Sequence, residues 1–207
     1  MDERALPQPM RPHGAVGRVF GFLMERLSAP IYRWVVVQLA PIKPRSYLEI
    51  GFGTGELARL VARRLKPQRL AGIDPSELMV ASATKKLRPF AKKTQIDLQL
   101  GDDTILAGIA GPFDAIAATH SFQFWRDPVA TLARIHALLA PGGLFVLVLR
   151  KHVSGSVMSW IPNPITKSGD ELGGARRALA GAGFHIVADE TLKTGSHGIV
   201  ATRGDEP

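Results

Sequence analysis

Short apolar runs alternate with segments of helical periodicity along most of the chain. The first complete example is the run Tyr47–Ile50, interrupted only by Glu49, which leads into three glycines at alternate positions. Apolar residues then recur at spacings of three and four between Leu57 and Leu65. A buried strand, a tight turn and an amphipathic helix in this order predict the opening of a βαβ unit.

The same alternation continues to the end of the chain and predicts an α/β domain. The run Leu144–Leu149 is almost wholly apolar, as expected of a central parallel strand that is buried on both faces. The last two runs lie close together and predict a β-hairpin at the sheet edge. In total we expect strands at 47–50, 69–73, 96–100, 113–118, 144–149, 184–192 and 198–202, and helices at 57–65, 77–87, 127–140 and 171–180. This pattern predicts a single doubly wound, seven-stranded, mostly parallel sheet of the Rossmann-like class.

The N-terminal segment 1–42 is expected to form an arm and a helical lid that belong to the same domain as residues 43–207. Its first 15 residues contain three prolines and predict an irregular arm. Val16–Leu27 predicts one helix, and Ser28 is placed to cap a second helix that carries Pro30 near its first turn. The two helices either pack on the sheet or form a lid over the ligand pocket.

Composition narrows the possible functions. The chain has 207 residues, 45% of them hydrophobic, which is enough for one domain with a substantial core. It has no cysteine, which excludes disulfides, thiolate zinc sites and a cysteine nucleophile. The sequence has no run of 18 apolar residues, so no membrane span is expected. The acidic N-terminus lacks the apolar region of a secretory signal. We therefore expect a cytoplasmic protein.

The net charge of +8 permits attraction to nucleic acid or to anionic lipid. The densest basic run is Lys85–Arg88, and its simplest interpretation is a helix end where cations complement the helix dipole. Aromatic residues are not interleaved with this run, as they would be on a surface that binds single strands. The expected partner is therefore a small molecule rather than nucleic acid, and the sequence leaves the oligomeric state open.

Gly51, Gly53 and Gly55 allow a backbone with positive φ and a close approach to a ligand. They lie beyond the carboxyl end of a strand, where open α/β sheets bind ligands. The dinucleotide fingerprint needs a third glycine where this chain has Glu56, and the strand itself carries Glu49. An acid repels a pyrophosphate and attracts an ammonium group, which favours a ligand with an amino-acid moiety.

Asp74 ends the second predicted strand, about twenty residues after the glycine loop. At that spacing an acid can accept hydrogen bonds from the two hydroxyls of a ribose. The alternative role is a helix N-cap, although Ser76 is available to cap the following helix instead. A ribose occurs in both NAD and S-adenosylmethionine (SAM), so Asp74 alone does not distinguish these ligands.

The glycine loop, Asp74, the turn Gly101-Asp102-Asp103 and the run Pro141-Gly142-Gly143 resemble, in order and spacing, the motifs of class I SAM-dependent methyltransferases. The resemblance covers residues 45–150, and the segment from His120 to Arg150 is similar to the small-molecule subgroup (methyltransferase type 11) that includes quinone-biosynthesis enzymes. It implies SAM as the cofactor and the strand order 3-2-1-4-5-7-6 with the last strand antiparallel. The cofactor contacts that it implies come from Glu49, Gly51, Phe52, Gly53, Asp74, Pro75, Met79, Gly101, Asp102, Asp103 and Thr119.

Two of these implied contacts leave alternatives open. In the family a residue at the position of Met79 packs on adenine, but an apolar residue there is also typical of core packing. The acid of the family's Gly-Asp-Ala turn accepts a hydrogen bond from the adenine amino group, and either Asp102 or Asp103 could do so here. No third oxygen ligand accompanies these two acids in the sequence, so no metal site is expected.

His120 is the candidate catalytic base. It follows the fourth strand, and an unperturbed histidine has a pKa suited to proton removal near neutrality. The alternative is that His120 bonds a nearby carbonyl or shapes the pocket. Residues 151–168 are the candidate acceptor loop, because long irregular segments in compact domains are often functional. Four further candidates for the acceptor pocket are Gln123, Trp125, His152 and Trp160.

We therefore expect an enzyme that transfers a methyl group from SAM to a small, partly apolar acceptor by in-line displacement. Enzymes that methylate exocyclic amino groups of bases share an Asp/Asn-Pro-Pro-Tyr/Phe run, and this chain has Thr119–Phe122 at those positions. An RNA methyltransferase and a SAM-binding protein without catalytic activity are the alternatives. Positioning contributes more to such a reaction than one general base, so the acceptor atom stays open.

Overall fold

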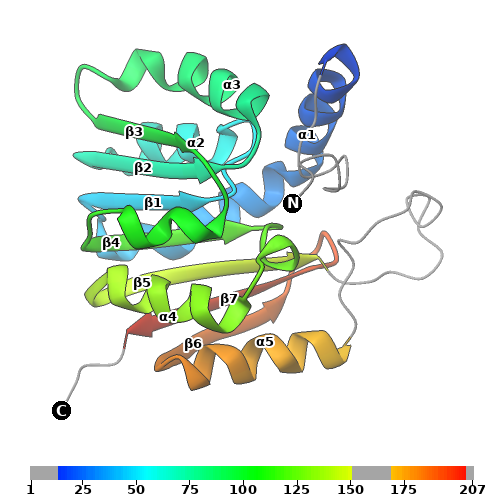
Figure 1. Cartoon of the computed structure of the whole chain (residues 1–207), viewed down its shortest axis with the longest axis vertical. Helices are drawn as coiled ribbons and strands as arrows, with labels where there is room; N and C mark the ends of the chain where they lie inside the picture. The colour runs from blue at the N-terminus through cyan, green and yellow to red at the C-terminus, as the bar shows by residue number, and fades with distance from the viewer. Residues whose placement is uncertain (1–13, 151–168, 204–207) are drawn as a thin grey trace.

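The computed structural model describes residues 14–150 and 169–203, which contain one seven-stranded sheet (Figure 1). The strand order is β3-β2-β1-β4-β5-β7-β6. Strands β1 to β5 are parallel, and β7 is antiparallel to both of its neighbours. The predicted fold class and strand order are therefore confirmed. The strands are β1 (Ser46–Ile50), β2 (Arg69–Asp74), β3 (Gln95–Leu100), β4 (Phe113–Thr119), β5 (Leu139–Arg150), β6 (Phe184–Thr191) and β7 (Ser196–Arg203).

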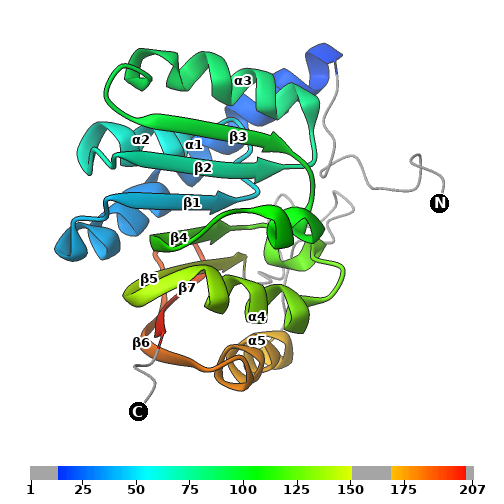
Figure 2. The ribbon, with the colours of Figure 1, turned by 60° about the vertical axis from the view of Figure 1, so that its left-hand side comes forward.

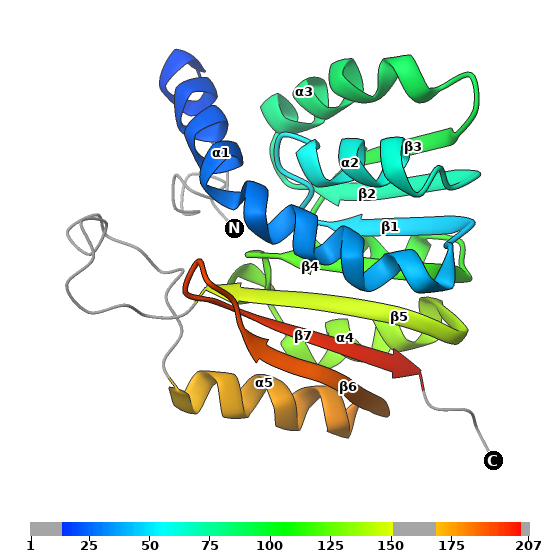
Figure 3. The same cartoon turned by 180° about the vertical axis from the view of Figure 1, so that it is seen from behind.

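Helices cover both faces of the sheet. Figure 3 shows α1 (Gly14–Leu39), α2 (Glu56–Arg64) and α3 (Glu77–Leu87) on one face. Figure 1 shows α4 (Pro128–Leu138) and α5 (Gly169–Gly181) on the other. None of the helices within the described ranges is both long and apolar enough to cross a membrane. Short 3₁₀ helices are η2 (Ala40–Ile42), η3 (Arg88–Phe90), η4 (Asp103–Gly108) and η5 (Phe122–Phe124).

The alternation of side chains along β1 divides the core into two layers. Tyr47 is fully buried among residues of α1 and α2, including Val35 and Val61. Leu48 and Ile50 point to the opposite face, where they join the layer formed with α4 and α5. Since β1 pairs with β2 on one side and β4 on the other, the glycine loop that follows it lies at the centre of the sheet.

The two predicted N-terminal helices form one continuous helix, so the break predicted at Ser28 is wrong. Pro30 lies inside α1, where it removes one intrahelical hydrogen bond, and the helix bends between its two halves (Figure 3). Burial explains why the chain continues as a helix, because Ile31, Val35 and Leu39 after the proline all reach the core. Packing on the sheet is thus established for this half, and the lid function stays a prediction.

The run Pro141-Gly142-Gly143 does not terminate a helix as predicted. Helix α4 ends earlier, at Leu138, and β5 already begins at Leu139. The pairing of β4 with β5 is irregular opposite this run, between Phe113 and Ala115, and Gly142 has a φ of +70°. The run therefore starts the strand with a local irregularity that a glycine accommodates.

The carboxyl ends of the parallel strands form one edge of the sheet, which we call the carboxyl edge. In Figure 2, β1 to β4 point toward this edge, and the glycine loop, η4 and η5 follow their ends. The β6–β7 hairpin reaches the same edge, because Ser196 at the start of β7 pairs with Arg150 at the end of β5. The predicted N-terminal arm and the predicted acceptor loop, with His152 and Trp160, lie outside the described residues.

Candidate cofactor and acceptor site

The glycine loop is confined at both ends and open in its middle. Gly51, Gly53 and Gly55 all have positive φ, at +75°, +54° and +77°. A Cβ at Gly51 would lie 2.7 Å from the Ser121 Cβ, and one at Gly55 would lie 2.6 Å from the Ala83 Cβ. A Cβ at Gly53 would meet nothing within 4 Å. The loop therefore leaves open space above Gly53, next to its own backbone.

Asp74 borders this open space. Its Oδ2 accepts a hydrogen bond from the Gly53 backbone N–H at 2.7 Å, and its Oδ1 accepts one from the Ser76 N–H at 3.0 Å. Burial raises the pKa of Asp74 to about 6, despite the two N–H groups that favour the carboxylate. Each carboxylate oxygen keeps acceptor capacity for a further donor. Asp74 thus ties the glycine loop to β2 and can still receive ligand hydroxyls.

Glu49 is buried in the core at the end of β1. Its side chain shares a strand face with Tyr47, two residues earlier, and is only 1% exposed. Its Oε2 accepts a hydrogen bond from the Tyr47 hydroxyl at 3.0 Å. Burial raises the pKa of Glu49 to about 8, and the nearby Asp74 contributes in the same direction. The neutral acid is therefore favoured at neutral pH, so the expected attraction of a charged Glu49 to an ammonium group is not supported.

Phe52 and Met79 pack against each other beside the glycine loop. Both are buried and form a small cluster with Ala83. The Phe52 ring lies close above β2, since a Cβ on Gly72 would be 2.7 Å from its Cδ1. Core packing is therefore observed for Met79, and contact with adenine stays a prediction for both residues.

The two acids after β3 point to different partners. Asp102 caps η4 by accepting from the Thr104 N–H at 3.1 Å, and it pairs with Arg126 at 3.0 Å. Burial acts to raise the pKa of Asp102, but the Thr104 hydrogen bonds and Arg126 outweigh it and hold the pKa below its usual value. Asp103 is buried and accepts from the Thr131 hydroxyl of α4 at 2.7 Å. Only Asp102 keeps a partly exposed carboxylate.

His120 stands at the carboxyl end of β4 in a left-handed backbone conformation, with φ at +56°. Its backbone N–H donates to the Val148 carbonyl at 2.9 Å, and its own carbonyl accepts from the Gln123 side-chain amide at 2.7 Å. Its Nε2 lies 3.2 Å from the Ser196 hydroxyl. Such a backbone in a non-glycine residue costs roughly 1–3 kcal/mol and persists only where surrounding contacts enforce it.

The environment of His120 keeps its ring neutral. Burial and the positive charge of Arg150 lower the pKa of His120 to about 4. The ring is a weaker base than an unperturbed histidine, because proton acceptance is less favourable at that pKa. Throughout the neutral pH range, the His120 ring can still donate or accept a hydrogen bond with a bound substrate.

Of the other predicted pocket residues, Trp125 belongs to the core layer of α4 and α5, where it packs on Phe122 with ring centroids 5.0 Å apart. Its Nε1 and the Gln123 Oε1 are buried and have no hydrogen-bond partner within the described ranges. Ser196 was not predicted, and no local signal marks it, because it lies 76 positions from His120. Thr119, Pro75 and Gly101 lie at the strand ends where they were predicted.

These residues fit a SAM molecule at the glycine loop. The open space above Gly53, the buried acceptor Asp74 and the partly exposed Asp102 lie along the ends of β1, β2 and β3. A separate hollow of about 250 Å³, lined by Lys43 and Asp114 among others, lies at the opposite edge of the sheet and contains none of these residues. Within residues 14–150 and 169–203, no group of three side chains is suited to hold a metal ion.

Comparison with known proteins also indicates a methyltransferase. A family model described as "Methyltransferase domain" matches residues 48–145. The uncharacterized methyltransferase YdaC of Bacillus subtilis is 26% identical over 132 residues, which are 64% of this chain and 71% of YdaC. A demethylmenaquinone methyltransferase of Bacteroides fragilis is 28% identical over 110 residues, covering 53% of this chain and 45% of that protein.

Among solved structures, the magnesium protoporphyrin IX methyltransferase ChlM from Synechocystis, with bound S-adenosylhomocysteine (SAH), aligns with a TM-score of 0.64. It is 18% identical, and the alignment covers 93% of this chain and 89% of ChlM. At this identity the likeness concerns the fold alone. The matched domain model covers just under half of this chain, and together with the strand order these comparisons support a class I SAM-dependent methyltransferase.

Proposed function

We propose that this protein transfers a methyl group from SAM to a small, partly apolar acceptor. The observation that carries the proposal is the arrangement of Gly53 and Asp74, which combines open space with a buried hydrogen-bond acceptor at the carboxyl edge. SAM supplies an activated methyl group on a sulfonium, and the protein's contribution is binding, orientation and electrostatics. Methyl transfer requires these functions more than it requires a strong base.

Each residue near the loop has a role in this proposal. Asp74 accepts hydrogen bonds from the ribose hydroxyls while it holds the Gly53 N–H. Asp102 is the acid that reaches the adenine amino group, and Asp103 leaves the proposal because it is bonded to Thr131 on α4. Glu49 is buried in β1, just before the glycine loop, where its carboxyl accepts the hydrogen bond from the Tyr47 hydroxyl.

The acceptor is proposed to bind beside His120, at the ends of β4 and β5. The name of the quinone methyltransferase relative supports a small acceptor, although this chain spans only about half of that relative. The His120–Ser196 pair places hydrogen-bonding groups at this side of the carboxyl edge. Orientation of the acceptor, rather than strong general-base catalysis, is the role that a neutral imidazole can fill.

Calorimetric titration of the protein with SAM and with NAD tests the cofactor. Asp74→Asn should weaken SAM binding by about 1.5–3 kcal/mol, roughly 10- to 150-fold, because hydrogen bonds to a charged group are lost. Asp97→Asn on β3 is the matched control, since Asp97 bonds only the neighbouring Gln99 side chain in the described structure. Tight NAD binding without SAM binding, or an unchanged SAM affinity in Asp74→Asn, would refute the proposal.

The pH dependence of SAM binding adds a second readout. Asp74 must be ionised to accept two ligand hydroxyls in addition to its backbone donors. Because its pKa is about 6, SAM affinity should fall as the pH drops below 6 and be constant well above it. Asp74→Asn should remove this dependence.

Release of SAH in the presence of candidate acceptors tests the substrate class. A panel of quinols, small carboxylic acids and mixed RNA separates the proposed acceptors from the alternative of an RNA methyltransferase. SAH release that depends only on RNA would contradict a small-molecule acceptor.

A further inference from the structure

The β6–β7 hairpin brings side chains to His120 from a distant part of the chain. Ser196, the first residue of β7, is 3% exposed, and its hydroxyl lies 3.2 Å from the His120 Nε2. Its strand partner is Arg150, the last residue of β5, whose positive charge also acts on His120. Two neighbouring residues of the sheet thus face the same imidazole.

The His120 ring has few other restraints. The hydrogen bonds to Val148 and from Gln123 involve the His120 backbone and do not act on the ring. Among the described residues, Ser196 alone bonds a ring nitrogen, and no described residue bonds Nδ1. A serine hydroxyl can donate to a ring nitrogen or accept from its N–H, so the Ser196 bond restrains the position of Nε2 with either tautomer.

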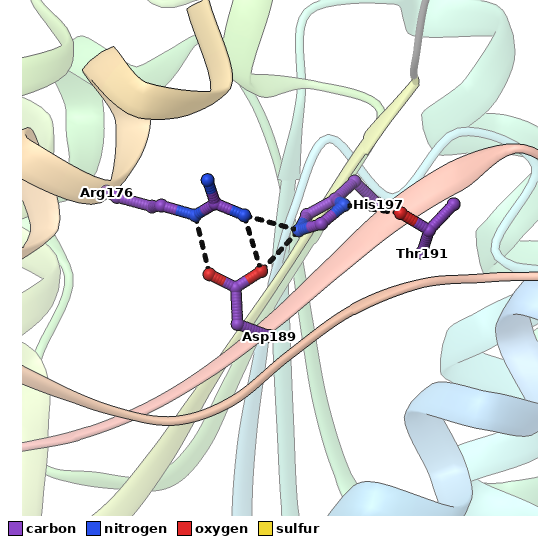
Figure 4. Close-up of polar contacts among 4 residues, drawn as sticks. All are labelled: Arg176, Asp189, Thr191 and His197. Atoms are coloured by element: carbon purple, nitrogen blue, oxygen red, sulfur yellow. Dashed lines mark hydrogen bonds and ion pairs between the residues drawn. The ribbon is translucent and has the colours of Figure 1, made fainter. Parts of the chain in front are cut away.

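A cluster of four residues holds the hairpin next to Ser196 (Figure 4). Arg176 of α5 forms a two-point ion pair with Asp189 of β6, with Nε–Oδ2 and Nη2–Oδ1 distances of 2.6 and 2.9 Å. Asp189 Oδ1 also accepts from the Nε2 of His197, and the Nδ1 of His197 lies 3.2 Å from the Thr191 hydroxyl. Since a carboxylate only accepts, His197 Nε2 carries a proton, and Nδ1 can accept from Thr191.

This cluster fixes the residue that follows Ser196 in the chain. His197 is only 5% exposed and points to the α5 side of the sheet, and Ser196 therefore points to the other side, toward His120. The hairpin is closed by a bond from the Leu192 N–H to the Ser196 carbonyl at 2.8 Å. Ser196 therefore has little freedom to move, because the ring of the next residue, His197, is bonded at both nitrogens and the Ser196 carbonyl is itself bonded.

We propose that Ser196 is a positioning residue that holds the His120 imidazole in one orientation, and that the Arg176–Asp189–His197 cluster holds Ser196 in place. This inference rests on the proposed function, in which His120 faces the acceptor. A fixed ring orientation sets the direction in which Nδ1 faces the acceptor molecule. The hairpin therefore contributes to acceptor recognition through its contact with His120.

The test is nitrogen NMR of the histidine rings in the full chain, labelled with ¹⁵N-histidine and titrated with acid. The wild type should show a His120 Nε2 signal that is shifted by its hydrogen bond to Ser196. Ser196→Ala should move this signal because the bond is lost, and Ser196→Thr, which keeps the hydroxyl, should restore it. Thr194→Ala, in the same turn, is the control and should change nothing. An unchanged His120 spectrum in Ser196→Ala would overturn the proposal.

Two further variants separate the contributions. Asp189→Asn should produce part of the Ser196→Ala change, because it weakens the cluster that holds His197; no change at His120 would overturn the role given to the cluster. Arg150→Gln should raise the pH at which the ring protonates and leave the Nε2 signal of the neutral ring as in the wild type. These spectra need no SAM, so they are independent of the titration that tests the proposed function. A protein that shows the Nε2 shift in Ser196→Ala but binds no SAM would refute that function and keep the positioning role.

Discussion

The two halves of the carboxyl edge are built in different ways. At the ends of β1, β2 and β3, the site consists of a glycine backbone and a carboxylate, Asp74, that lies 21 residues from its partner Gly53. At the ends of β4, β5 and β7, it consists of side chains that meet across long separations, such as His120 and Ser196 at 76 residues. The first half depends on local backbone conformation, and the second depends on how distant strands are aligned.

The two halves also differ in the effect of burial on their ionisable groups. Burial raises the pKa of Glu49 to about 8 and that of Asp74 to about 6, whereas burial and Arg150 lower the pKa of His120 to about 4. Each shift favours the neutral form, but the consequences for stability have opposite signs. We call the half at β1, β2 and β3 the cofactor half and the half at β4, β5 and β7 the acceptor half, after the ligands they are proposed to bind. The contribution of the cofactor half to stability should fall as the pH rises, and that of the acceptor half should fall as the pH drops.

The largest expected effect tests the first sign. Between pH 4.5 and 8 the folded protein keeps the Glu49 proton while the unfolded chain releases it, so unfolding becomes easier as the pH rises. Glu49→Gln keeps an acceptor for the Tyr47 hydroxyl and cannot ionise. Its stability relative to the wild type should therefore improve by several kcal/mol from pH 5 to pH 8, measured by urea unfolding at each pH.

The control for this measurement is Glu77→Gln, which removes an exposed carboxyl from the first turn of α3. It should follow the wild-type curve with at most a small constant offset. If Glu49→Gln also parallels the wild type from pH 5 to pH 8, Glu49 is ionised in the folded protein, and the contrast between the two halves fails.

The second prediction concerns the backbone of the cofactor half. Gly55→Ala places a Cβ 2.6 Å from the Ala83 Cβ and 2.9 Å from the Ala83 Cα, in a backbone with φ at +77°. Strain and overpacking together should cost about 2–5 kcal/mol of stability. Gly53→Ala is the matched variant, because its φ is also positive but its Cβ meets nothing within 4 Å.

The two variants should separate stability from binding. In Gly53→Ala only backbone strain should lower the stability, by about 1–2 kcal/mol. The variant should also weaken SAM binding, because its methyl group enters the open space. Thermal unfolding and SAM titration measure the two effects. Equal stability losses in both variants would mean that Ala83 yields to the new Cβ and that the loop is not confined at Gly55.

The difference between the halves explains what the sequence could predict. The glycine loop, Asp74 and the strand–helix boundaries around them follow from local patterns, and the structure contains them at the predicted residues. The seven strands and their order were likewise confirmed. Motifs of this kind are legible because the residues that define them are neighbours in sequence or are separated by one βαβ unit.

The errors came from effects that only the folded chain determines. The local pattern predicts a new helix capped by Ser28, but burial of the residues after Pro30 continues α1 through it. The local pattern also predicts a charged Glu49, but strand alternation places this residue beside Tyr47 in the core. Ser196 left no local signal, because the pairing of β5 with β7 brings it to His120 from 76 positions away.

The smallest of the three expected effects tests the opposite sign in the acceptor half. Between pH 6.5 and 4 the unfolded chain protonates His120 and the folded protein does not, so wild-type stability should lose a contribution as the pH falls. His120→Gln cannot protonate and keeps an amide near the Ser196 hydroxyl. Its stability relative to the wild type should improve by about 1–3 kcal/mol from pH 7 to pH 4.5, measured by urea unfolding. The constant cost of a glutamine at φ +56° offsets the curve without changing its slope.

His185→Gln on β6, whose side chain is exposed, is the matched control and should parallel the wild type. A His120→Gln curve that also runs parallel would show that the ring protonates equally in the folded and unfolded states, and the two halves would then share one pH response.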